Sequence, residues 1–367
     1  MHTELNLVMT LALALALGCG GGTDDLDSGA PVPDAGDTPR DSAVPDAGDT
    51  PRDSSVPEGD GGPRPPALTV YLTGSDDDVA VTPTGPGLVL MGGSTEVDAA
   101  FTWWNGYLGG GDVVILRVSG SDGYNPYLYF DIGGIDSVET LMVTTRALAD
   151  SDYVAWRIRH AEGIFIAGGD QSDYVNLWKG SGVEEALMHA WGRGAVLGGT
   201  SAGLAILGEF VFAAFNGSVT SSEALADPYH TAVQLDRDFL AVPLLADVIT
   251  DSHFSERGRM GRLIAFLARI VADGWSGAPL GLGIDERTAL VVGPDGAGQV
   301  MGEGAVYLLT SNGTPTTCMA GVALEYGDLG VTELRDGDTL TLPGGTSPVG
   351  SRLVSATGGN TVPADPY

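Results

Sequence analysis

Residues 194–209 read GAVLGGTSAGLAILGE, and this stretch decides the fold. Residues 195–197 form a short apolar run between glycines, which predicts a buried strand. Residues 202–209 are mostly small and apolar, which predicts a helix. Between them lies Gly199-Thr200-Ser201-Ala202-Gly203, so the serine stands at a sharp turn between the strand and the helix. A strand that leads directly into a helix is typical of α/β proteins.

The same alternation of strand and helix extends outward from this stretch. Short apolar runs that end in glycine-rich turns predict further strands at residues 68–72, 88–91, 113–118 and 164–167, and a helix is predicted at residues 183–191. We therefore predict an α/β fold, with a mostly parallel sheet and helices on both faces. Residues 299–342 alternate strand and turn patterns without clear helices, so short antiparallel β elements are expected near the C-terminus.

The composition excludes some classes of function. The 367 residues include 48 Asp and Glu but 17 Lys and Arg, which gives a formal net charge of -31. Recognition of phosphate groups needs clustered basic residues, so a nucleic-acid partner is not expected. A hydrophobic share of 43% and the length of the chain are sufficient for a folded core.

The first 19 residues resemble an export signal. Residues 5–18 are an apolar run of 14, which suits a signal peptide and is too short to span a membrane as a helix. The run ends at Leu17-Gly18-Cys19, which resembles a bacterial lipobox, in which Cys19 would be lipidated. A plain secretory signal is the alternative, because the start of the chain has no Lys or Arg. Either interpretation predicts an exported protein: a lipoprotein held at the cell envelope by its anchor, or a periplasmic or secreted one.

Residues 20–66 predict a linker. The sequence VPDAGDTPRDS occurs at residues 32–42 and again at residues 44–54, and a stretch rich in Pro and Gly follows. Such a composition buries too little apolar surface to offset its ordering entropy, so a disordered acidic linker is expected. Residues 67–367 then form the folded domain.

The motif around Ser201 is the strongest candidate for chemistry. G-x-S-x-G between a strand and a helix is typical of a nucleophile elbow, because small neighbours allow the strained turn. A serine that merely caps a helix is the alternative. No metal or cofactor is expected, because the five histidines (His2, His160, His189, His230 and His253) are far apart and no phosphate-binding loop motif is present.

Three more blocks accompany this motif in a fixed order. Residues 168–171 read GGDQ before it, residues 251–263 read DSHFSERGRMGRL after it, and residues 281–290 read GLGIDERTAL near the end. Together with GTSAG, these blocks resemble the cyanophycinase branch of the serine peptidases that also include aspartyl dipeptidase E. The resemblance covers residues 92–309. It implies a three-layer α/β sandwich like the class I glutamine amidotransferase domain, with serine as the nucleophile.

The resemblance also implies a catalytic triad. Ser201 needs a base, and His253 is the histidine with polar and charged neighbours in the sequence, which suits a catalytic centre. Glu286 in the GIDE block is implied as the acid that orients His253, and Asp285 is the alternative. A helix-capping or surface acid is the other interpretation of Glu286. The backbone N–H groups of Gly169 and Ala202, from two glycine turns at one edge of the sheet, are expected to bind the oxyanion.

Substrate-binding residues are expected around these three. Asp170 and Gln171 either hold a substrate group or shape their turn. Among the residues of the third block (Asp251, Arg257, Arg259 and Arg262), Arg257 is expected one turn beyond His253 and is the best candidate for a substrate carboxylate. For Arg262, an ion pair with an internal acid is as plausible as a contact with the substrate. Ser252 replaces a glutamine that is usual in the family, which leaves the identity of the substrate open.

The sequence therefore supports two hypotheses. The first is an exported, lipid-anchored serine exopeptidase that hydrolyses aspartyl, isoaspartyl or cyanophycin-like peptides through an acyl-enzyme. The second is a catalytically inactive ligand-binding domain on the same fold at the cell surface. The expected partners are a peptide substrate and, through Cys19, a membrane; a homodimer is left open.

Overall fold

Alternating apolar residues give the central strands two buried faces. Along β2 (Gly87–Met91), Leu88 and Leu90 lie in one core cluster, whereas Val89 and Met91 lie in another. The next strand in the sequence, β3 (Asp112–Arg117), divides its apolar side chains between the same two clusters. Successive side chains of a strand point to opposite faces, so both faces of this sheet are covered by other elements.

The computed structural model describes residues 61–311 and 313–367. The expected signal, Cys19 and the expected linker up to residue 60 lie outside them. In the described part of the chain, no helix is both long enough and apolar enough to cross a membrane.

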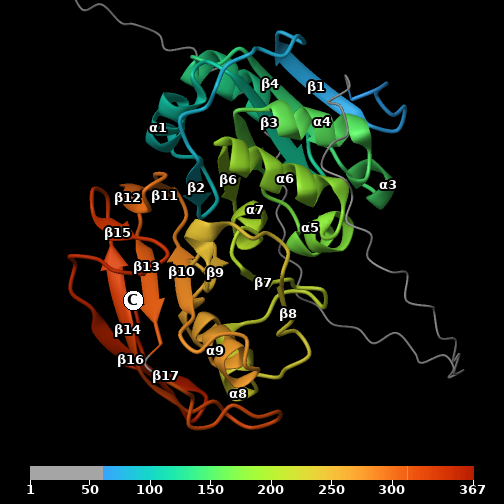
Figure 1. The fold of residues 1–367 in the computed structure, drawn as a ribbon. Coiled ribbons are helices and arrows are strands. Elements are labelled where there is room, and N and C mark those ends of the chain that lie inside the picture. Colours follow the sequence, from blue (N-terminus) through green and yellow to red (C-terminus); the bar gives the residue numbers. More distant parts are fainter. Residues whose placement is uncertain (1–60, 312) are drawn as a thin grey trace, which may run out of the picture. The chain divides into compact units, whose positions relative to one another are not determined.

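The described strands form two sheets (Figure 1). Sheet A has nine strands, in the order β1 (Thr69–Gly74), β4 (Ser137–Met142), β3, β5 (Gly163–Ile166), β6 (Val196–Thr200), β2, β11 (Thr288–Val292), β12 (Ala297–Gly302) and β15 (Thr339–Thr341). The neighbours from β4 to β2 pair in parallel, and the outer strands on both sides pair antiparallel. The parallel centre is what the sequence predicts.

Sheet B is larger than the sequence predicts. Its eight described strands are β17 (Asn360–Val362), β16 (Arg352–Thr357), β14 (Tyr326–Leu334), β13 (Val306–Thr310), β10 (Leu280–Ile284), β9 (Val248–Asp251), β7 (Phe210–Phe212) and β8 (Leu235–Arg237). The expected antiparallel pieces near the C-terminus are present. Of these, β13 and β14 continue sheet B, whose strands β9 and β10 are parallel, whereas β12 and β15 belong to sheet A. Strand patterns in the sequence do not show which sheet a strand joins.

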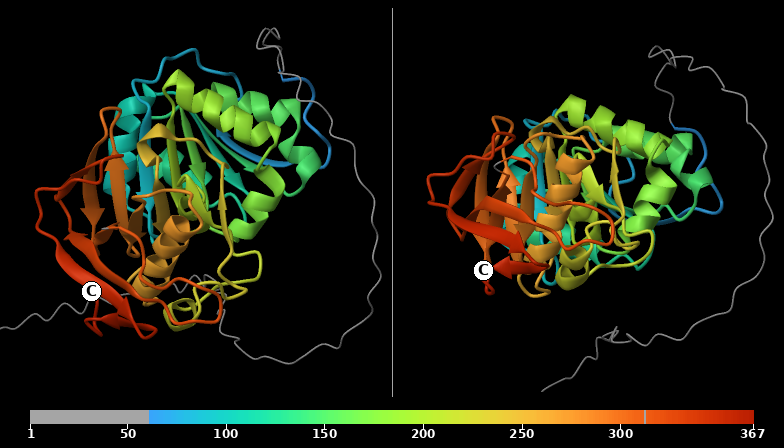
Figure 2. Two further views of the ribbon diagram at one scale, coloured as in Figure 1. Left: turned by 60° about the horizontal axis from the view of Figure 1, so that its bottom comes forward. Right: turned by 90° about the horizontal axis from the view of Figure 1, so that it is seen from below.

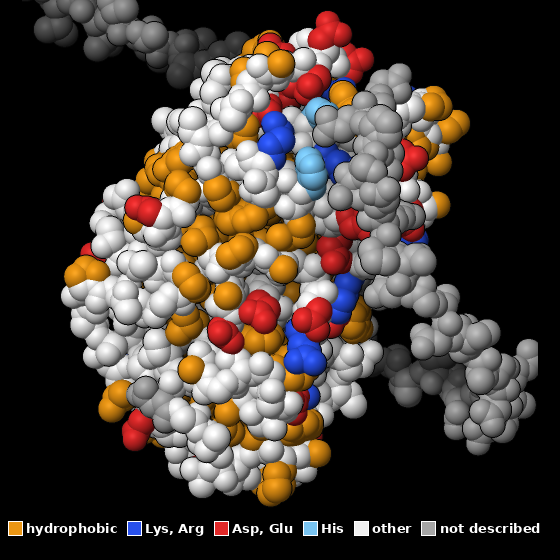
Figure 3. Space-filling view, in the orientation of Figure 1, with side chains coloured by type: hydrophobic (Ala, Val, Ile, Leu, Met, Phe, Trp, Pro, Cys, Tyr) orange, Lys and Arg blue, Asp and Glu red, His pale blue; other side chains and the backbone are white. Residues whose placement is uncertain are grey.

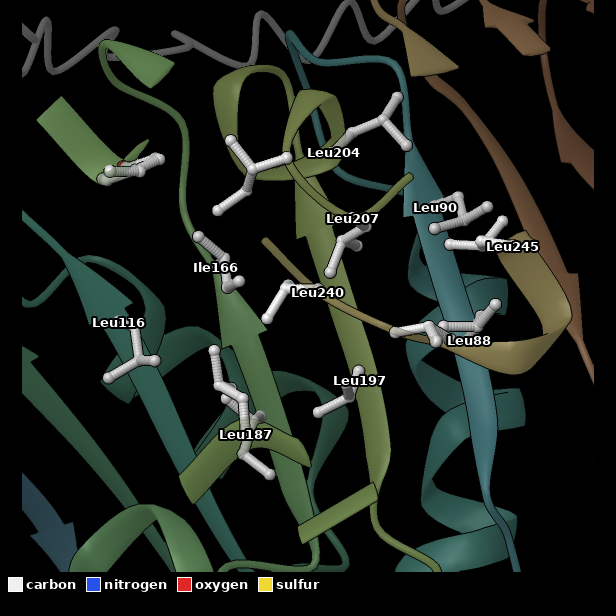
Figure 4. Packing of buried hydrophobic residues seen from close by; sticks show 14 of the residues in the cluster. Leu88, Leu90, Leu116, Ile166, Leu187, Leu197, Leu204, Leu207, Leu240 and Leu245 are labelled. Atoms are coloured by element: carbon white, nitrogen blue, oxygen red, sulfur yellow. The ribbon is translucent and has the colours of Figure 1, made fainter. Parts of the chain in front are cut away.

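Helices cover the sheets, as Figures 1 and 2 show. In chain order they are α1 (Asp98–Leu108), α2 (Tyr124–Pro126), the π-helical turn η1 (Tyr127–Ile132), α3 (Arg146–Ala149), α4 (Asp152–His160), α5 (Gln171–Trp178), α6 (Gly182–Arg193), α7 (Ala202–Ala205), α8 (Ser221–Ala226), the 3₁₀ turn η2 (Pro243–Leu245) and α9 (Met260–Ala272). Helix α1 packs on one face of sheet A, and α4, α5 and α6 pack on the other. Figure 4 shows Leu187 of α6 beside Leu197 of β6 and Leu116 of β3. The expected α/β class, with helices on both sides of a parallel centre, is confirmed.

Two elements differ from their expected extent. The helix after the serine, α7, ends at Ala205 rather than at Glu209, because the chain must turn at Gly208 to enter β7. Helix α9 begins at Met260, so His253 and Arg257 lie in the turns that precede it rather than on a helix. The N–H of Arg257 still donates to the carbonyl oxygen of His253 at 3.2 Å, which makes a single turn.

Candidate active site

The turn at Ser201 is strained. Its φ of 52° and ψ of -114° lie in a region that non-glycine residues rarely adopt. A Cβ at Gly199 would lie 2.5 Å from the carbonyl carbon of Gly203, and a Cβ at Gly203 would overlap the backbone of Ile166. The glycines of the motif are therefore required by close packing between β6, α7 and β5. This packing leaves the serine partly exposed at the carboxyl end of β6.

Ser201, His253 and Glu286 form one hydrogen-bonded chain. The distance from Ser201 Oγ to His253 Nε2 is 2.8 Å, and His253 Nδ1 is 2.7 Å from Glu286 Oε1. Both distances are those of ordinary hydrogen bonds. The serine follows a strand of sheet A, whereas the histidine and the glutamate follow β9 and β10 of sheet B. The arrangement therefore combines side chains from two sheets.

The histidine of this chain is largely buried. Burial lowers the pKa of His253 from its usual value, and the hydrogen bond to Glu286 acts in the opposite direction. The same hydrogen bond lowers the pKa of Glu286, so this carboxylate is charged at neutral pH. A neutral imidazole that is held by a carboxylate can accept a proton from Ser201 Oγ.

Asp285 has a different environment from its neighbour Glu286. It is buried, and its carboxylate accepts hydrogen bonds from the N–H groups of Ser255 at 2.8 Å and Ala305 at 3.1 Å. Those bonds connect the loop after His253 to sheet B. The geometry thus places Glu286, and not Asp285, beside the histidine.

A contact between the two sheets fixes the positions of the serine and the histidine relative to each other. Thr250 of β9 donates from its hydroxyl to the carbonyl oxygen of Leu204 in α7 at 2.8 Å. This bond is buried and joins the strand before His253 to the helix after Ser201. We expect such a connection to limit relative movement of the two side chains.

A small pocket opens beside Ser201. It is lined by Gly169, Gln171, Ser201, Ala202, Ala205, Phe212, Thr250, Asp251, Ser252, His253, Arg257, Arg259 and Arg262. Three arginines and one aspartate give this lining a formal charge of +2, with His253 neutral. A positive pocket in a chain of net charge -31 suits an anionic group of a ligand.

The pocket arginines are not equivalent. Arg262 is buried and pairs with both carboxylate oxygens of Asp251, with Nε 2.8 Å from Oδ2. Its Nη1 also donates to Ser218 Oγ at 3.1 Å, and its guanidinium lies 5.1 Å from the ring centre of Phe212. This geometry favours the internal pair as the role of Arg262 and of Asp251, which build the wall of the pocket.

Arg259 and Arg257 are the cations nearer to solvent. Arg259 Nη1 donates to the carbonyl oxygen of Ser252 at 2.8 Å and lies 3.4 Å from its hydroxyl oxygen. Burial lowers the pKa of Arg259 to about 10, so it stays charged at neutral pH. Arg257 is exposed. Ser252 thus contacts an arginine instead of leaving an empty space.

The GGDQ block contributes to the same pocket as the nucleophile. Gly169 and Ala202 line the same pocket as Ser201, and the N–H of Ala202 is the first of α7. Asp170 is exposed and caps α5, because its Oδ1 accepts from the N–H of Ser172 at 2.9 Å. Gln171 lines the pocket. The structure therefore gives Asp170 the turn-shaping role and places Gln171 in the lining of the pocket.

One part of the site is not predicted by the sequence patterns. The loop after β2 brings Gly92 and Gly93 against the histidine, and a Cβ at Gly93 would lie 2.6 Å from His253 Nε2. The signal was present as a glycine pair directly after the apolar run at residues 88–91. The role of this glycine pair depends on the contact of Gly93 with His253, which is 160 positions away in the sequence. Local sequence patterns do not reveal such a contact.

The surface carries basic side chains as well as acidic ones, although the net charge of the chain is strongly negative. The face shown in Figure 3 carries acidic and basic side chains close to one another. The acidic composition therefore does not prevent a local positive site such as the pocket beside Ser201.

Comparisons with known proteins agree with the four blocks. Residues 127–300 match the model of peptidase family S51. The chain is 35% identical over 225 residues to a cyanophycinase of Synechococcus elongatus, which covers 59% of this chain and 64% of that protein. It is 32% identical over 181 residues to a cyanophycinase of Trichormus variabilis, which covers 49% of this chain and 55% of that protein. The chain thus spans less than two thirds of the length of these relatives.

The resemblance expected from the sequence is thereby confirmed. Among solved structures, a peptidase from an acI-B1 Actinobacterium aligns with a TM-score of 0.47 and 17% identity, over 70% of this chain and 97% of that one.

Proposed function

We propose that this chain, a relative of the peptidases of family S51, is a serine exopeptidase with Ser201 as its nucleophile, His253 as its base and Glu286 as the orienting acid. The hydrogen-bonded chain from Ser201 Oγ through His253 to Glu286 supports this proposal most directly. A serine, a histidine and a carboxylate in this geometry are recognised as a triad whatever their order in the sequence.

The proposed reaction has two steps. Ser201 Oγ attacks the scissile carbonyl carbon while His253 Nε2 takes its proton, and the imidazolium then gives that proton to the leaving amine. This breaks the peptide bond and leaves an ester on Ser201. A water molecule, deprotonated by His253, attacks the ester, which releases the acid and returns the proton to Ser201.

Two backbone groups are proposed to stabilise the oxyanion. Gly169 and Ala202 line the pocket beside Ser201, and backbone N–H donors stabilise charge that develops in the transition state. Glu286 would stabilise the positive charge that forms on His253 at the same moment.

We propose peptides with an aspartyl or isoaspartyl unit as substrates. The carrying observation is the positive pocket, in which the single carboxylate of Asp251 pairs with Arg262 and also lies 3.4 Å from Arg259 Nη1. The lining therefore keeps an excess of positive charge, and Arg257 is its most exposed cation. An arginine can pair with a carboxylate through two hydrogen bonds. Because Ser252 provides a short hydroxyl in place of the long amide of a glutamine, we expect weaker preference for the β-Asp-Arg unit of cyanophycin than typical relatives show.

A fluorophosphonate probe tests the nucleophile. We expect the wild type to be labelled at one serine, and Ser201→Ala and His253→Ala to abolish labelling and lower turnover by on the order of 10³-fold or more while the fold is kept. Cys318→Ala is the control and should leave both unchanged. A folded wild type that binds peptides but is neither labelled nor active would support the inactive ligand-binding domain instead.

A charge deletion in the pocket tests the substrate. Arg257→Ala should raise KM for an aspartyl or isoaspartyl peptide by about tenfold, and should affect the uncharged amide analogue less, because one charge-assisted hydrogen bond is lost. Arg335→Ala removes an equally charged side chain, 64% exposed, outside the residues that line the pocket, and should change neither KM. Equal effects of Arg257→Ala on both substrates would contradict the carboxylate pocket. Efficient, exclusive cleavage of cyanophycin would contradict the expectation for Ser252.

We also propose export of the chain and a lipid anchor at Cys19. The apolar run at residues 5–18 and the lipobox-like end at Leu17-Gly18-Cys19 support this. Cys19→Ser should release the protein from a membrane fraction if the anchor is real. An unchanged distribution would favour the plain secretory signal.

A further inference from the structure

One loop contacts the backbone of the residues that carry the triad. It follows β2 and comprises residues 92–97, between β2 and α1. The carbonyl oxygen of Met91, just before it, accepts from the N–H of Ser201 at 3.2 Å, and that of Gly92 accepts from the N–H of His253 at 2.8 Å. The nucleophile and the base are therefore both attached to the start of this loop.

The next residue extends these contacts to the acid. The carbonyl oxygen of Gly93 accepts from the N–H of Arg287, the residue after Glu286, at 3.0 Å. The Cα of Gly93 packs on the imidazole of His253 so closely that a side chain would not fit. The loop therefore contacts the segments of His253 and Glu286 directly, and the end of β2 from which it starts contacts Ser201. Movement of the loop together with this end of β2 would displace the segments of all three triad residues.

The far end of the loop is held by a side-chain pair. Glu96 accepts a hydrogen bond at Oε1 from the hydroxyl of Tyr124, a residue of α2. The ring of Tyr124 packs against Phe165 of β5, with ring centres 5.4 Å apart. Glu96 is thus tied through Tyr124 to a strand of sheet A that lies next to β6.

We propose that Glu96, through its bond to Tyr124, is a positioning residue that fixes the loop at residues 92–97 and with it the alignment of Ser201, His253 and Glu286. This inference rests on the proposed function. Glu96 does not line the pocket and acts through the loop rather than on the substrate. A misplacement of about 1 Å can cost a catalytic site on the order of 10²-fold in rate, so a loop that contacts two of the three segments and begins at the strand end that contacts the third has a large effect on turnover.

The environment of Glu96 indicates which feature of the side chain matters. Burial raises the pKa of Glu96 to about 7, although the hydroxyls of Tyr124 and Thr200 act in the opposite direction and lower it. A substantial part of the protein therefore carries a neutral carboxyl at neutral pH, and this form still accepts from Tyr124. A glutamine has an oxygen acceptor at the same position, so Glu96→Gln should preserve the function that Glu96→Ala removes.

A neighbouring pair provides a matched control. Tyr127 of η1 donates from its hydroxyl to Asp98 Oδ1 of α1 at 2.6 Å. This is also a hydrogen bond from a tyrosine hydroxyl to a carboxylate. Tyr127 is three residues after Tyr124 and Asp98 is two residues after Glu96, but Asp98 belongs to helix α1 and not to the loop at residues 92–97. Tyr127→Phe therefore removes a similar bond without loosening the loop.

The experiment measures fluorophosphonate labelling of Ser201, kcat, KM and Tm for the full chain. We expect Glu96→Ala and Tyr124→Phe to lower the labelling rate and kcat by about tenfold, because the triad is misaligned, with KM changed by less than about twofold. Glu96→Gln should stay within about twofold of the wild type, as should Tyr127→Phe. If Glu96→Ala does not fold, Tyr124→Phe and Glu96→Gln still make the comparison.

Several results would overturn the inference. They are unchanged rates in Tyr124→Phe, an equal loss in Tyr127→Phe, no recovery in Glu96→Gln, or a rise in KM with kcat unchanged, which would make Glu96 a substrate-binding residue. A wild type that does not react with the probe would overturn the proposed function and this inference together, whereas a reactive wild type with unaffected variants overturns the inference alone.

Discussion

Three residues at the proposed site have a strained backbone. Ser201, with a φ of 52°, and His253, with a φ of 44°, both adopt left-handed backbone conformations, and so does Arg287 directly after Glu286. Such conformations cost on the order of 1–3 kcal/mol each and persist where the surrounding structure enforces them. Hydrogen bonds from all three N–H groups to the end of β2 and the loop after it provide that enforcement.

The pH dependence of activity should report the environment of His253. Its pKa is lowered below 6.5 by burial, and the base must be neutral to accept a proton. Activity should therefore be lost as the pH falls through a value below 6.5, and a profile of kcat/KM against pH measures this limb. Glu286→Gln removes the contact that raises this pKa, so the limb should move to lower pH while the rate falls by on the order of 10²–10⁴-fold. A limb that moves to higher pH would contradict the role of Glu286.

At the scale of elements, the elbow depends on how closely β6, α7 and β5 approach one another. The helix α7 packs on β5 through Gly203, whose missing side chain lets the backbone of Ile166 lie against it. The hydroxyl of Thr250 then attaches β9 to α7. The proposed site is thus supported by backbone packing on one side and by a buried hydrogen bond on the other.

Gly203→Ala should destabilise the protein although it adds a single methyl group. Its Cβ would lie 2.7 Å from the carbonyl carbon of Ile166, which is backbone and cannot move aside easily. The free energy of unfolding should fall by about 1–3 kcal/mol, as for other overpacked cores. Gly192→Ala in α6 meets nothing within 4 Å and should instead stabilise the protein by about 0.5–1 kcal/mol. Denaturant unfolding measures both, and equal effects would contradict the packing argument.

At the scale of the molecule, the proposed site joins sheet A to sheet B. Leu90 of β2 and Ile284 of β10 belong to the same core cluster, so the two sheets share buried apolar surface. Ser201 comes from one sheet and its two partners from the other. Formation of the site therefore requires both sheets to be folded and packed.

The N-terminal segment should be dispensable for this site. The described residues from 61 onward belong to one compact unit, and residues 20–56 have a composition that cannot form a core. A shortened chain that begins at Pro57 should keep the Tm and the kcat/KM of the full chain within about twofold. Thermal unfolding and turnover measurements check this, and a large loss of either would show that the acidic repeat contributes to the folded unit.

The sequence by itself determined the local features of this protein. The apolar runs and glycine turns predicted four of the five strands of the parallel centre, β2, β3, β5 and β6, but not β4, which contains Ser137, Glu139 and Thr140. The G-x-S-x-G motif predicted the strained serine, because such a turn depends on neighbours along the chain. The order of the four sequence blocks was sufficient to indicate the resemblance to the cyanophycinase family, because such a comparison requires no knowledge of contacts in the fold.

The tertiary structure alone decided how distant side chains pair. It placed Glu286 rather than Asp285 on His253, paired Arg262 with Asp251, extended the C-terminal strands into sheet B and brought Gly93 against the imidazole. Each of these depends on strand order, register and side-chain direction, which follow from packing of the whole fold. A change of one residue in register reverses the direction of every side chain in a strand, so local patterns could not predict these contacts.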